Sequence, residues 1–522
     1  MVCRQRIRTV DTIAPLQFGG PIYLYEMSNG KAVVIGAGVG GLAASIRLAA
    51  RGWDVDVLEK NEGPGGKLTA FEKDGYLFDA GPSLFTQPAN LRELFDLAGK
   101  NIGDYFRYRS VPVSNQYFFE NGKRVQAYAD AERLAQEMER ELGEDPEAVV
   151  SYMKRSARLY DRIGTVFLDY SLHRSSTWLN NRILSALSVL RPSDLWQTLN
   201  SYNQIRFRTP EAVQIFNRFA TYNGSSPFRT PAMLSMIPHL EINEGTFYPE
   251  GGMISITRSL HKLAGDLGVR FHFNTPTDRI TVDSGRVSGV ESGGRIWKAD
   301  AVISNADVYY TYLRLLGDEA AAKHVLRQER SSSAVIFYWG IGREFPQLGL
   351  HNIFFTRDYP GEFDGLFRTG KLSDDPTIYV NITSKMEAGQ APAGKENWFV
   401  MVNAPADRGQ DWPALRSVLR EHVLNKLSRM LGADVRSAIE TEETLDPGLI
   451  QHKTSSYMGS LYGTSSNSVF SAFLRHPNAR NAVRGLYFCG GSVHPGGGIP
   501  LCLKSARIAT ELLFEDVASK KH

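Results

Sequence analysis

The sequence predicts a mixed α/β fold built on a Rossmann-like dinucleotide-binding lobe, and three observations carry that prediction. Residues Ala32–Ile35 form an apolar run of the length expected for a buried parallel strand. An Ala- and Leu-rich helix candidate, residues 42–51, leads from there to a second strand candidate that ends at Glu59. Between the first strand and the helix stand glycines in G-x-G-x-x-G spacing, at Gly36, Gly38 and Gly41.

Each part of this unit has a physical role in binding a dinucleotide. The first glycine allows a tight turn, the second lets a phosphate approach the backbone, and the third lets helix and strand pack closely. The helix N-terminus then faces the phosphates. Glu59 lies 18 residues past Gly41, where an acidic side chain meets a ribose hydroxyl. The complete order favours a dinucleotide site over a purely structural glycine turn.

Size and composition narrow the classes of protein. A chain of 522 residues has room for two or three lobes with sizeable cores. A net charge of only +3 gives no reason to propose nucleic acid as a partner. The three cysteines form no CxxC pair, which favours a reduced, cytoplasmic setting. No stretch is expected to span a membrane, and residues 1–26 lack the apolar core of a signal peptide, so the domain is expected to begin near Met27.

Three further motifs carry a resemblance to a known family. They are GPGGK at residues 63–67, GYLFDAGPSLFTQP at 75–88 and GLYFCGGSVHPGGGIP at 485–500. With the first motif they resemble the flavin-dependent amine oxidase and phytoene desaturase superfamily, and within it the carotenoid desaturases. The chain departs from the family at Lys67, where arginine is usual, at Gly63, where a basic residue is common, and at Ser492, where many amine oxidases carry an acid.

The resemblance implies that the cofactor is FAD, and we expect no metal site. Thr277 and Asp278 are expected to hold the adenine through backbone atoms, and the loop before residue 501 is expected to meet the flavin. Together with the glycine pattern, the predicted cofactor-binding residues are Gly36, Gly38, Gly40, Gly41, Glu59, Lys60, Gly65, Gly66, Lys67, Gly81, Pro82, Ser83, Thr277, Asp278, Asn305, Gly490, Gly491, Ser492, Gly498, Ile499 and Pro500.

Both ends of the chain are predicted to build the cofactor lobe, with the substrate lobe inserted between them. The predicted divisions are an N-terminal extension (1–29), three parts of the FAD-binding domain (30–115, 245–330 and 441–515), a helical substrate and membrane-associating region (116–244), a substrate-domain sheet (331–440) and a tail (516–522).

Two stretches of the inserted region leave alternatives open. Trp178–Trp196 has apolar residues on one helical face, flanked by Arg174, Arg182 and Arg191. This pattern is typical of a helix at a membrane interface, but it favours slightly more a core helix of the substrate lobe. Residues 331–403 hold three aromatic, β-branched strand candidates, which form either the wall of an apolar polyene pocket or an ordinary sheet core.

The resemblance implies an FAD-dependent carotenoid desaturase that forms C=C bonds in a long polyene by hydride transfer to the flavin. The sequences of the segments GGSVHPGGGIP and LRHPN favour the 1-hydroxycarotenoid 3,4-desaturase group. A flavin-dependent carotenoid isomerase or saturase would share the fold, whereas a non-catalytic carotenoid-binding protein would not need the flavin motif. The expected partners are a carotenoid substrate, a membrane lipid surface bound peripherally, and an external electron acceptor, oxygen or quinone.

Three polar side chains are candidates for a chemical role. His494 lies in the loop expected to border the flavin and is the candidate acceptor of the proton released during desaturation. The alternative is a histidine hydrogen-bonded to loop backbone. Asp79 is expected to cap a turn rather than act as an acid, and His239 to be a hydrogen-bonded core histidine.

Overall fold

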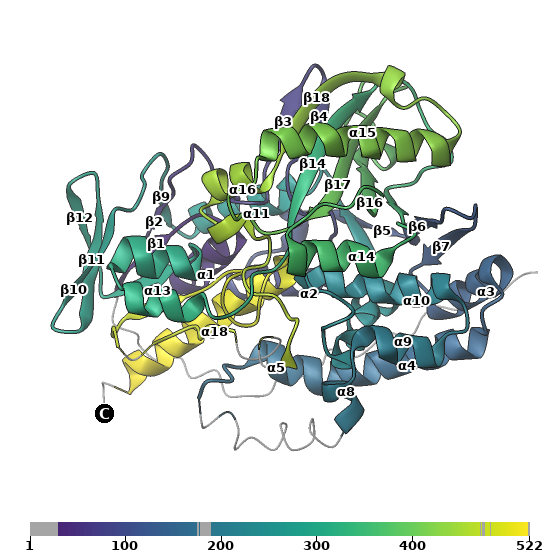
Figure 1. The fold of residues 1–522 in the computed structure, drawn as a ribbon. Helices are drawn as coiled ribbons and strands as arrows, with labels where there is room; N and C mark the ends of the chain where they lie inside the picture. The colour runs from purple at the N-terminus through teal and green to yellow at the C-terminus, as the bar shows by residue number, and fades with distance from the viewer. Residues whose placement is uncertain are drawn as a thin grey trace, which may run out of the picture.

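A computed structural model describes residues 30–519 apart from 175–176, 178–188, 470, 472–474 and 481. The predicted extension, residues 1–29, and the last three residues of the predicted tail lie outside the described residues. So does most of the predicted amphipathic stretch, residues 178–188. Figure 1 shows a parallel sheet with long helices, a second large sheet, and a layer of helices beside it.

The cofactor lobe is centred on a five-stranded sheet in which every pairing is parallel. Its first strand, β1, lies between β13 and β2, so the chain enters in the middle of the sheet and returns to both edges. The strands, in spatial order, are β19 (Leu486–Phe488), β13 (Ala301–Ser304), β1 (Lys31–Ile35), β2 (Asp54–Leu58) and β9 (Arg270–His272).

Long helices cover this sheet and close its core. Strand β1 is buried from Ala32 to Ile35 because helices and neighbouring strands leave no face open to water. The helices that share its hydrophobic core are α1 (Val39–Ala49), α2 (Pro88–Leu97), α11 (Ile254–Asp266) and α18 (Ile499–Ala518). The predicted strand, helix and strand of the first unit are confirmed to within three residues at each boundary.

An antiparallel sheet of three strands flanks the parallel sheet at one end (Figure 1). The chain passes from one sheet to the other within residues 269–283, because β9 joins the parallel sheet and β10 pairs with the next strand. Ser284 and Gly285 adopt positive φ in the turn between the paired strands. The strands are β10 (Arg279–Asp283), β11 (Arg286–Ser292) and β12 (Arg295–Lys298).

The second large sheet has seven strands and separates two hydrophobic layers. Side chains alternate along β14: Phe337 and Trp339 pack toward α15 (Trp412–Leu431), whereas Ile336 and Tyr338 pack toward the hairpin of β3 (Ala70–Lys73) and β4 (Tyr76–Asp79). In order, the strands are β18 (Ile439–Leu445), β14 (Ser333–Ile341), β17 (Glu396–Ala404), β16 (Ile378–Ile382), β15 (His351–Phe354), β6 (Val113–Phe118) and β7 (Arg124–Tyr128).

The three strand candidates between residues 331 and 403 are thus confirmed as β14, β15 and β16 of one sheet. Their aromatic side chains belong to the layers on the two faces of that sheet. The predicted boundary at residue 116 falls inside β6, so this sheet takes strands from both sides of it.

A helical layer lies beside the large sheet (Figure 1). Its core brings Tyr152, Phe207 and Phe216 together, and Val189 and Leu190 at the described end of the predicted amphipathic stretch pack against the same core. The helices of this layer are α3 (Ala131–Leu142), α4 (Pro146–Leu159), α5 (Thr165–Asp169), α8 (Pro192–Trp196), α9 (Leu199–Arg206) and α10 (Pro210–Asn217).

Short elements complete the chain and connect the lobes. Among the described residues, no helix combines the length and the apolar character that a membrane crossing requires. The remaining elements are β5 (Tyr108–Val111), β8 (Thr246–Pro249), α12 (Val308–Tyr310), α13 (Glu319–Val325), α14 (Tyr359–Asp364) and α16 (Pro447–Thr454).

Candidate active site

The glycine turn after β1 leaves the N-terminus of α1 open to a ligand. Gly36 has a φ of +90°, and Gly38 stands at the N-cap without a side-chain hydrogen bond to the first turn. A helix begins with backbone N–H groups that have no partner inside the helix, and these groups favour an anion. A Cβ on Gly41 would lie 2.0 Å from the carbonyl oxygen of Gly36, which explains why the third glycine has no side chain.

Glu59 lies at the end of β2 with its carboxylate turned toward this turn. Its Oε2 accepts a hydrogen bond of 2.8 Å from the N–H of Ala37, and its Oε1 accepts one of 2.9 Å from the N–H of Asn61. The residue is only 5% exposed. Because each carboxylate oxygen has two lone pairs, Glu59 holds the glycine turn and can still accept from a ribose hydroxyl.

The second glycine segment runs beside the first. Gly65 donates a hydrogen bond of 2.9 Å to the carbonyl of Ala37, and Gly65 and Gly66 both adopt positive φ. The ammonium of Lys67 donates to the carbonyl oxygens of Ser460 and Leu461, at 3.2 and 2.9 Å. Burial lowers the pKa of Lys67 to about 8. An ammonium has three protons, so one remains for an anion.

Lys60, the next predicted contact, is used in the same way. Its Nζ donates to the carbonyl oxygen of His452 and to the hydroxyl of Ser455, each at 2.9 Å. Burial lowers its pKa. The lysine therefore ties the end of β2 to the C-terminal end of α16, which sequence reasoning did not foresee.

Asn305 joins the first motif to the C-terminal loop. A Cβ on Gly40 would lie 2.6 Å from the Oδ1 of Asn305 and 3.2 Å from the N of Gly490. The three segments therefore meet within van der Waals distance, although more than 180 residues separate Asn305 from Gly490 along the chain. Ser492 completes the junction, because its Oγ accepts a hydrogen bond of 3.0 Å from the N–H of Val308.

The C-terminal loop ends in a second open helix N-terminus. Gly498 caps α18 with a φ of +109°, without a side-chain hydrogen bond, and a Cβ there would meet nothing within 4 Å. The helix begins at Ile499 and Pro500, two residues earlier than predicted. Gly497 differs from its neighbour: its φ is not positive, and a Cβ would lie 2.9 Å from the Cα of Tyr462. Packing rather than a positive φ requires the glycine there.

The loop after β4, which contains Gly81 and Pro82, reaches the large sheet through Ser83. The hydroxyl of Ser83 lies 2.7 Å from the hydroxyl of Tyr379, which in turn lies 2.7 Å from the Nδ1 of His351. His351 is buried, and burial lowers its pKa to about 4. Sequence reasoning missed Tyr379 and His351. The alternation in TIYVNI was the available signal, because it places Tyr379 and Asn381 on one face of β16.

The segment predicted to hold adenine lies next to Glu59. The N–H of Thr275 donates 2.8 Å to the carbonyl of Glu59, which brings Thr277 and Asp278 to the same end of the sheet. The N–H of Asp278 is used by the β-hairpin, where it donates to the carbonyl of Glu291. The hydroxyl of Thr277 is buried and has no hydrogen-bond partner. An unpaired buried hydroxyl is costly unless a ligand satisfies it.

His494 is buried in the C-terminal loop. Its Nε2 lies 3.0 Å from the carbonyl oxygen of Tyr170, so Nε2 carries the proton. Burial lowers the pKa of His494 to about 4, and the imidazole is neutral at pH 7. Its own carbonyl accepts hydrogen bonds from Asn478 and Ser505, each at 2.8 Å. The residue therefore connects the loop to the segment after α5.

The two other polar side chains have structural partners. Asp79 accepts hydrogen bonds from the N–H groups of Met253 and Ile254, at 2.9 and 3.2 Å, and caps α11. Burial raises its pKa to about 6. His239 lies 2.9 Å from the side-chain amide of Asn243 and only 12% of its side chain is exposed. The predicted capping role of Asp79 is confirmed, although the capped element is a helix.

These features fit FAD. Two open helix N-termini can receive phosphate and flavin oxygens, a carboxylate stands at the ribose position, and an unpaired hydroxyl of Thr277 lies at the predicted adenine end. All predicted cofactor residues on the first motif, residues 65–67, Asn305 and the C-terminal loop come together at one junction. Pro82 and Ser83 lie on the side of that junction that faces the large sheet.

Comparisons with known proteins agree with this geometry. The profile of the family described as flavin containing amine oxidoreductase matches residues 39–513. The chain is 46% identical to a 1-hydroxycarotenoid 3,4-desaturase of Flavobacterium over 483 residues, which are 92% of this chain and 99% of that protein. It is 34% identical to a 4,4'-diapolycopene oxygenase of Methylomonas, over 94% of this chain and 99% of that one. An oxidoreductase of Methanosarcina mazei shares the fold, with a TM-score of 0.61 and 17% identity over 92% of this chain and all of that one.

Proposed function

Because this chain belongs to the family of flavin-containing amine oxidoreductases, we propose that it is an FAD-dependent carotenoid desaturase whose substrate is a hydroxylated carotenoid. The observation that carries the proposal is the 46% identity with a 1-hydroxycarotenoid 3,4-desaturase over nearly the whole of both chains. The proposal that the substrate carries a hydroxyl group follows from that name alone. The flavin motif and the C-terminal loop are both intact. A carotenoid-binding carrier without redox chemistry would not need them.

Residues of this chain would hold FAD at the junction described above. The open N-terminus of α1 would receive the pyrophosphate, and Glu59 a ribose hydroxyl. The N-terminus of α18, beginning after Gly498, would favour the electron-rich edge of the flavin. Desaturation removes one hydrogen as hydride and a second as a proton, and bound FAD supplies the acceptor for the hydride.

The chain itself must take the proton and keep water away. His494 remains our proposed acceptor: it is neutral at pH 7, and its Nδ1 carries no proton when Nε2 donates to Tyr170. A pKa of about 4 makes it a weak base. The same hydrogen bond also gives His494 a positioning task, because it holds the C-terminal loop against the segment after α5. The two tasks make different kinetic predictions.

We also propose that the enzyme collects its substrate from a lipid surface and passes electrons to an external acceptor, oxygen or quinone. A long polyene partitions into lipid, and only one dinucleotide motif is present for a bound cofactor.

Anaerobic incubation of the purified flavoprotein with candidate carotenoids tests the proposal. A hydroxycarotenoid in detergent micelles should bleach the flavin absorbance near stoichiometrically, while the absorbance of the polyene shifts to longer wavelength. An isomerase would change the polyene spectrum without net bleaching, and an oxygenase would need oxygen to form product. Bound NAD in an active protein without flavin would contradict the proposal.

Substitution of His494 separates its two possible tasks. As the proton acceptor, His494→Ala should lower the rate of flavin reduction about a hundredfold while FAD stays bound. As a positioning residue, His494→Gln should retain the hydrogen bond to the carbonyl of Tyr170 and restore most of the rate. Unchanged reduction in His494→Ala would remove the residue from the mechanism. His239→Ala is the matched control, because its side chain is also mostly buried in an apolar setting.

A further inference from the structure

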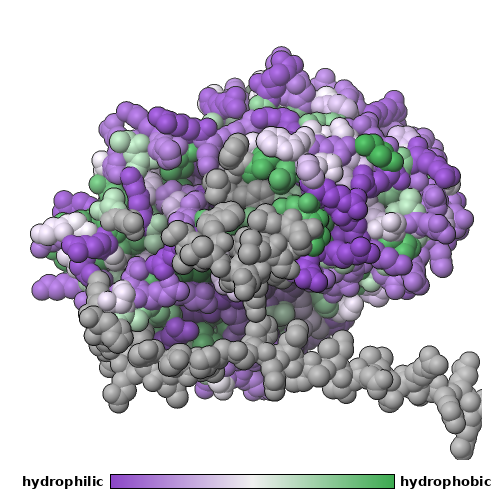
Figure 2. All heavy atoms as spheres, turned by 90° about the horizontal axis from the view of Figure 1, so that it is seen from below, coloured by the Kyte–Doolittle hydropathy of each residue, from purple (hydrophilic) through white to green (hydrophobic). Residues whose placement is uncertain are grey.

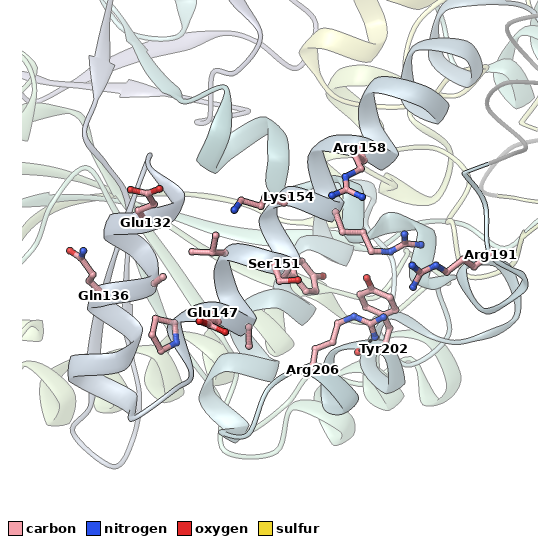
Figure 3. Close-up of a pocket in the computed structure, with 15 residues that line it drawn as sticks. Glu132, Gln136, Glu147, Ser151, Lys154, Arg158, Arg191, Tyr202 and Arg206 are labelled. Atoms are coloured by element: carbon pink, nitrogen blue, oxygen red, sulfur yellow. Dashed lines mark hydrogen bonds between the residues drawn. The ribbon is translucent and has the colours of Figure 1, made fainter.

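A basic groove crosses the helical layer away from the cofactor junction. It has a volume of about 800 Å³ and is lined by residues of α3, α4 and α9 and by Arg191 at the start of α8. Figure 3 shows that the groove is polarised: Glu132, Gln136 and Glu147 lie at one end, and the guanidinium groups of Arg158, Arg191 and Arg206 gather at the other.

Two of the cations at the basic end are held by neighbouring groups, and others have no anionic partner in the described part of the chain. Arg155 is paired with the buried Asp194, at 2.8 and 2.6 Å. The guanidinium carbon of Arg206 lies 3.3 Å from the centre of the Tyr202 ring, and its Nη1 donates to the carbonyl of Tyr202. Among the described residues, no carboxylate forms an ion pair with Arg158, Arg191 or Lys154. A phosphate would find several free N–H donors here.

The most exposed large hydrophobic side chains of the described residues lie on the same elements. Trp196, the last residue of α8, is 81% exposed, and Ile205, the neighbour of Arg206 in α9, is 73% exposed. Hydrophilic residues cover most of the right-hand part of the face seen in Figure 2, which is the side on which α3 and α4 lie in Figure 1. Trp196 and Ile205 therefore present apolar surface to the solvent on the two helices that contribute Arg191 and Arg206 to the groove.

We infer that this groove binds the phosphate of an anionic phospholipid while Trp196 and Ile205 enter the interface beside it. Tryptophan favours the headgroup level of a bilayer, and clustered Lys and Arg favour anionic lipid. The inference rests on the proposed function, because a polyene must be taken from lipid, and it adds the lipid class and the residues. Arg174 has no part in it, because its guanidinium pairs with Glu515 and Asp516.

Vesicle flotation of the FAD-loaded protein tests the inference. One set of vesicles is pure phosphatidylcholine, and the other contains 30% phosphatidylglycerol. The protein should prefer the anionic vesicles, and this preference should fall as salt is raised. Arg158→Gln with Arg206→Gln should weaken binding to anionic vesicles about tenfold or more and change binding to neutral vesicles little. Trp196→Ser with Ile205→Ser should weaken binding to both.

Strand β12 supplies the matched controls. Lys298 is an exposed cation and Ile296 is a 58% exposed hydrophobic residue, and both lie at the far end of the molecule from α9 (Figure 1). Lys298→Gln and Ile296→Ser should leave flotation unchanged. Equal losses in these variants, or no loss in the groove variants, would overturn the inference.

Two further measurements complete the test. The first distinguishes a lipid headgroup from a soluble anion as the ligand. The second tests the lipid site independently of the proposed function. Competition by millimolar inorganic phosphate, with equal binding to neutral and anionic vesicles, would show a site for a small anion and refute the lipid assignment. Turnover of carotenoid in neutral detergent micelles should be the same in all variants. If the unaltered protein binds anionic vesicles but turns over no carotenoid in micelles, the proposed function fails while the lipid site stands.

Discussion

The polar interiors of the cofactor lobe and of the helical layer are built from different chemical groups. In the cofactor lobe, backbone N–H groups at two helix starts and one carboxylate, Glu59, form the proposed FAD site, and glycines would allow close approach. In the helical layer, a buried ion pair between Arg218 and Glu241 organises the interior, with Tyr222 and Asn115 also bonded to Glu241. The first arrangement depends mainly on backbone shape, and the second on hydrogen bonds between side chains, one of which reaches Glu241 from Asn115, 126 residues earlier.

The largest expected effect lies in the helical layer. Glu241→Gln leaves the guanidinium of Arg218, whose side chain is 10% exposed, without a charged partner. Removal of one member of a buried pair costs about 3 to 5 kcal/mol of unfolding free energy. Denaturant unfolding measures it, and the flavin content of the folded fraction should stay unchanged if the two regions are independent.

The control for this change is an exposed ion pair. Glu291 pairs with Arg279 at 2.7 Å on the antiparallel sheet, where the arginine side chain is 66% exposed. Glu291→Gln should cost less than about 1 kcal/mol. A cost for Glu241→Gln no greater than that of the control would show that the buried pair does not organise the helical layer.

A smaller effect is expected from the carboxylate of the cofactor lobe. Glu59→Ala removes the acceptor for the N–H of Ala37 and for a ribose hydroxyl, which should cost about 1 to 3 kcal/mol. FAD should then bind about ten to a hundred times more weakly, as measured by titration of the apoprotein. Glu62→Ala, an exposed acid three residues on, should bind FAD normally. Equal FAD affinity in both variants would remove Glu59 from the ribose site.

The contrast also explains what the sequence could predict. The glycines, the first two strands and Glu59 are close together along the chain, so spacing alone placed them. Asn305 was also among the predicted cofactor-binding residues, although it is far from the glycines along the chain. Its contact with Gly40 and Gly490 brings it to the same junction.

The parts that could not be predicted depend on long-range packing. Lys67 binds carbonyl oxygens almost 400 residues away, and the partner of Ser83 is Tyr379 on another sheet. No local pattern specifies such pairs. Gly497 is a further example, since Tyr462 fills the space where a Cβ would stand.

The smallest effect returns to the parallel sheet, at a buried side chain outside the cofactor junction. Asp56 on β2 accepts hydrogen bonds from Arg270 and His272 on β9, at 2.8 to 2.9 Å. Although burial raises the pKa of Asp56, these hydrogen bonds dominate and hold it at about 2. Asp56 therefore ties the edge strand β9 to the sheet. As in the helical layer, the contact joins side chains that are far apart along the chain.

The lowered pKa fixes the direction of the pH dependence. The stabilising contribution of Asp56 is fully present above the unfolded pKa of about 4 and is lost as pH falls through about 2. Because Arg270 is 48% exposed, solvent screening limits the contribution to about 1 kcal/mol. Urea unfolding of the protein and of Asp56→Asn should show a constant difference in unfolding free energy above pH 5 that shrinks steadily toward pH 2. A difference independent of pH over this range would mean that packing of the side chain, and not its charge, ties β9 to the sheet.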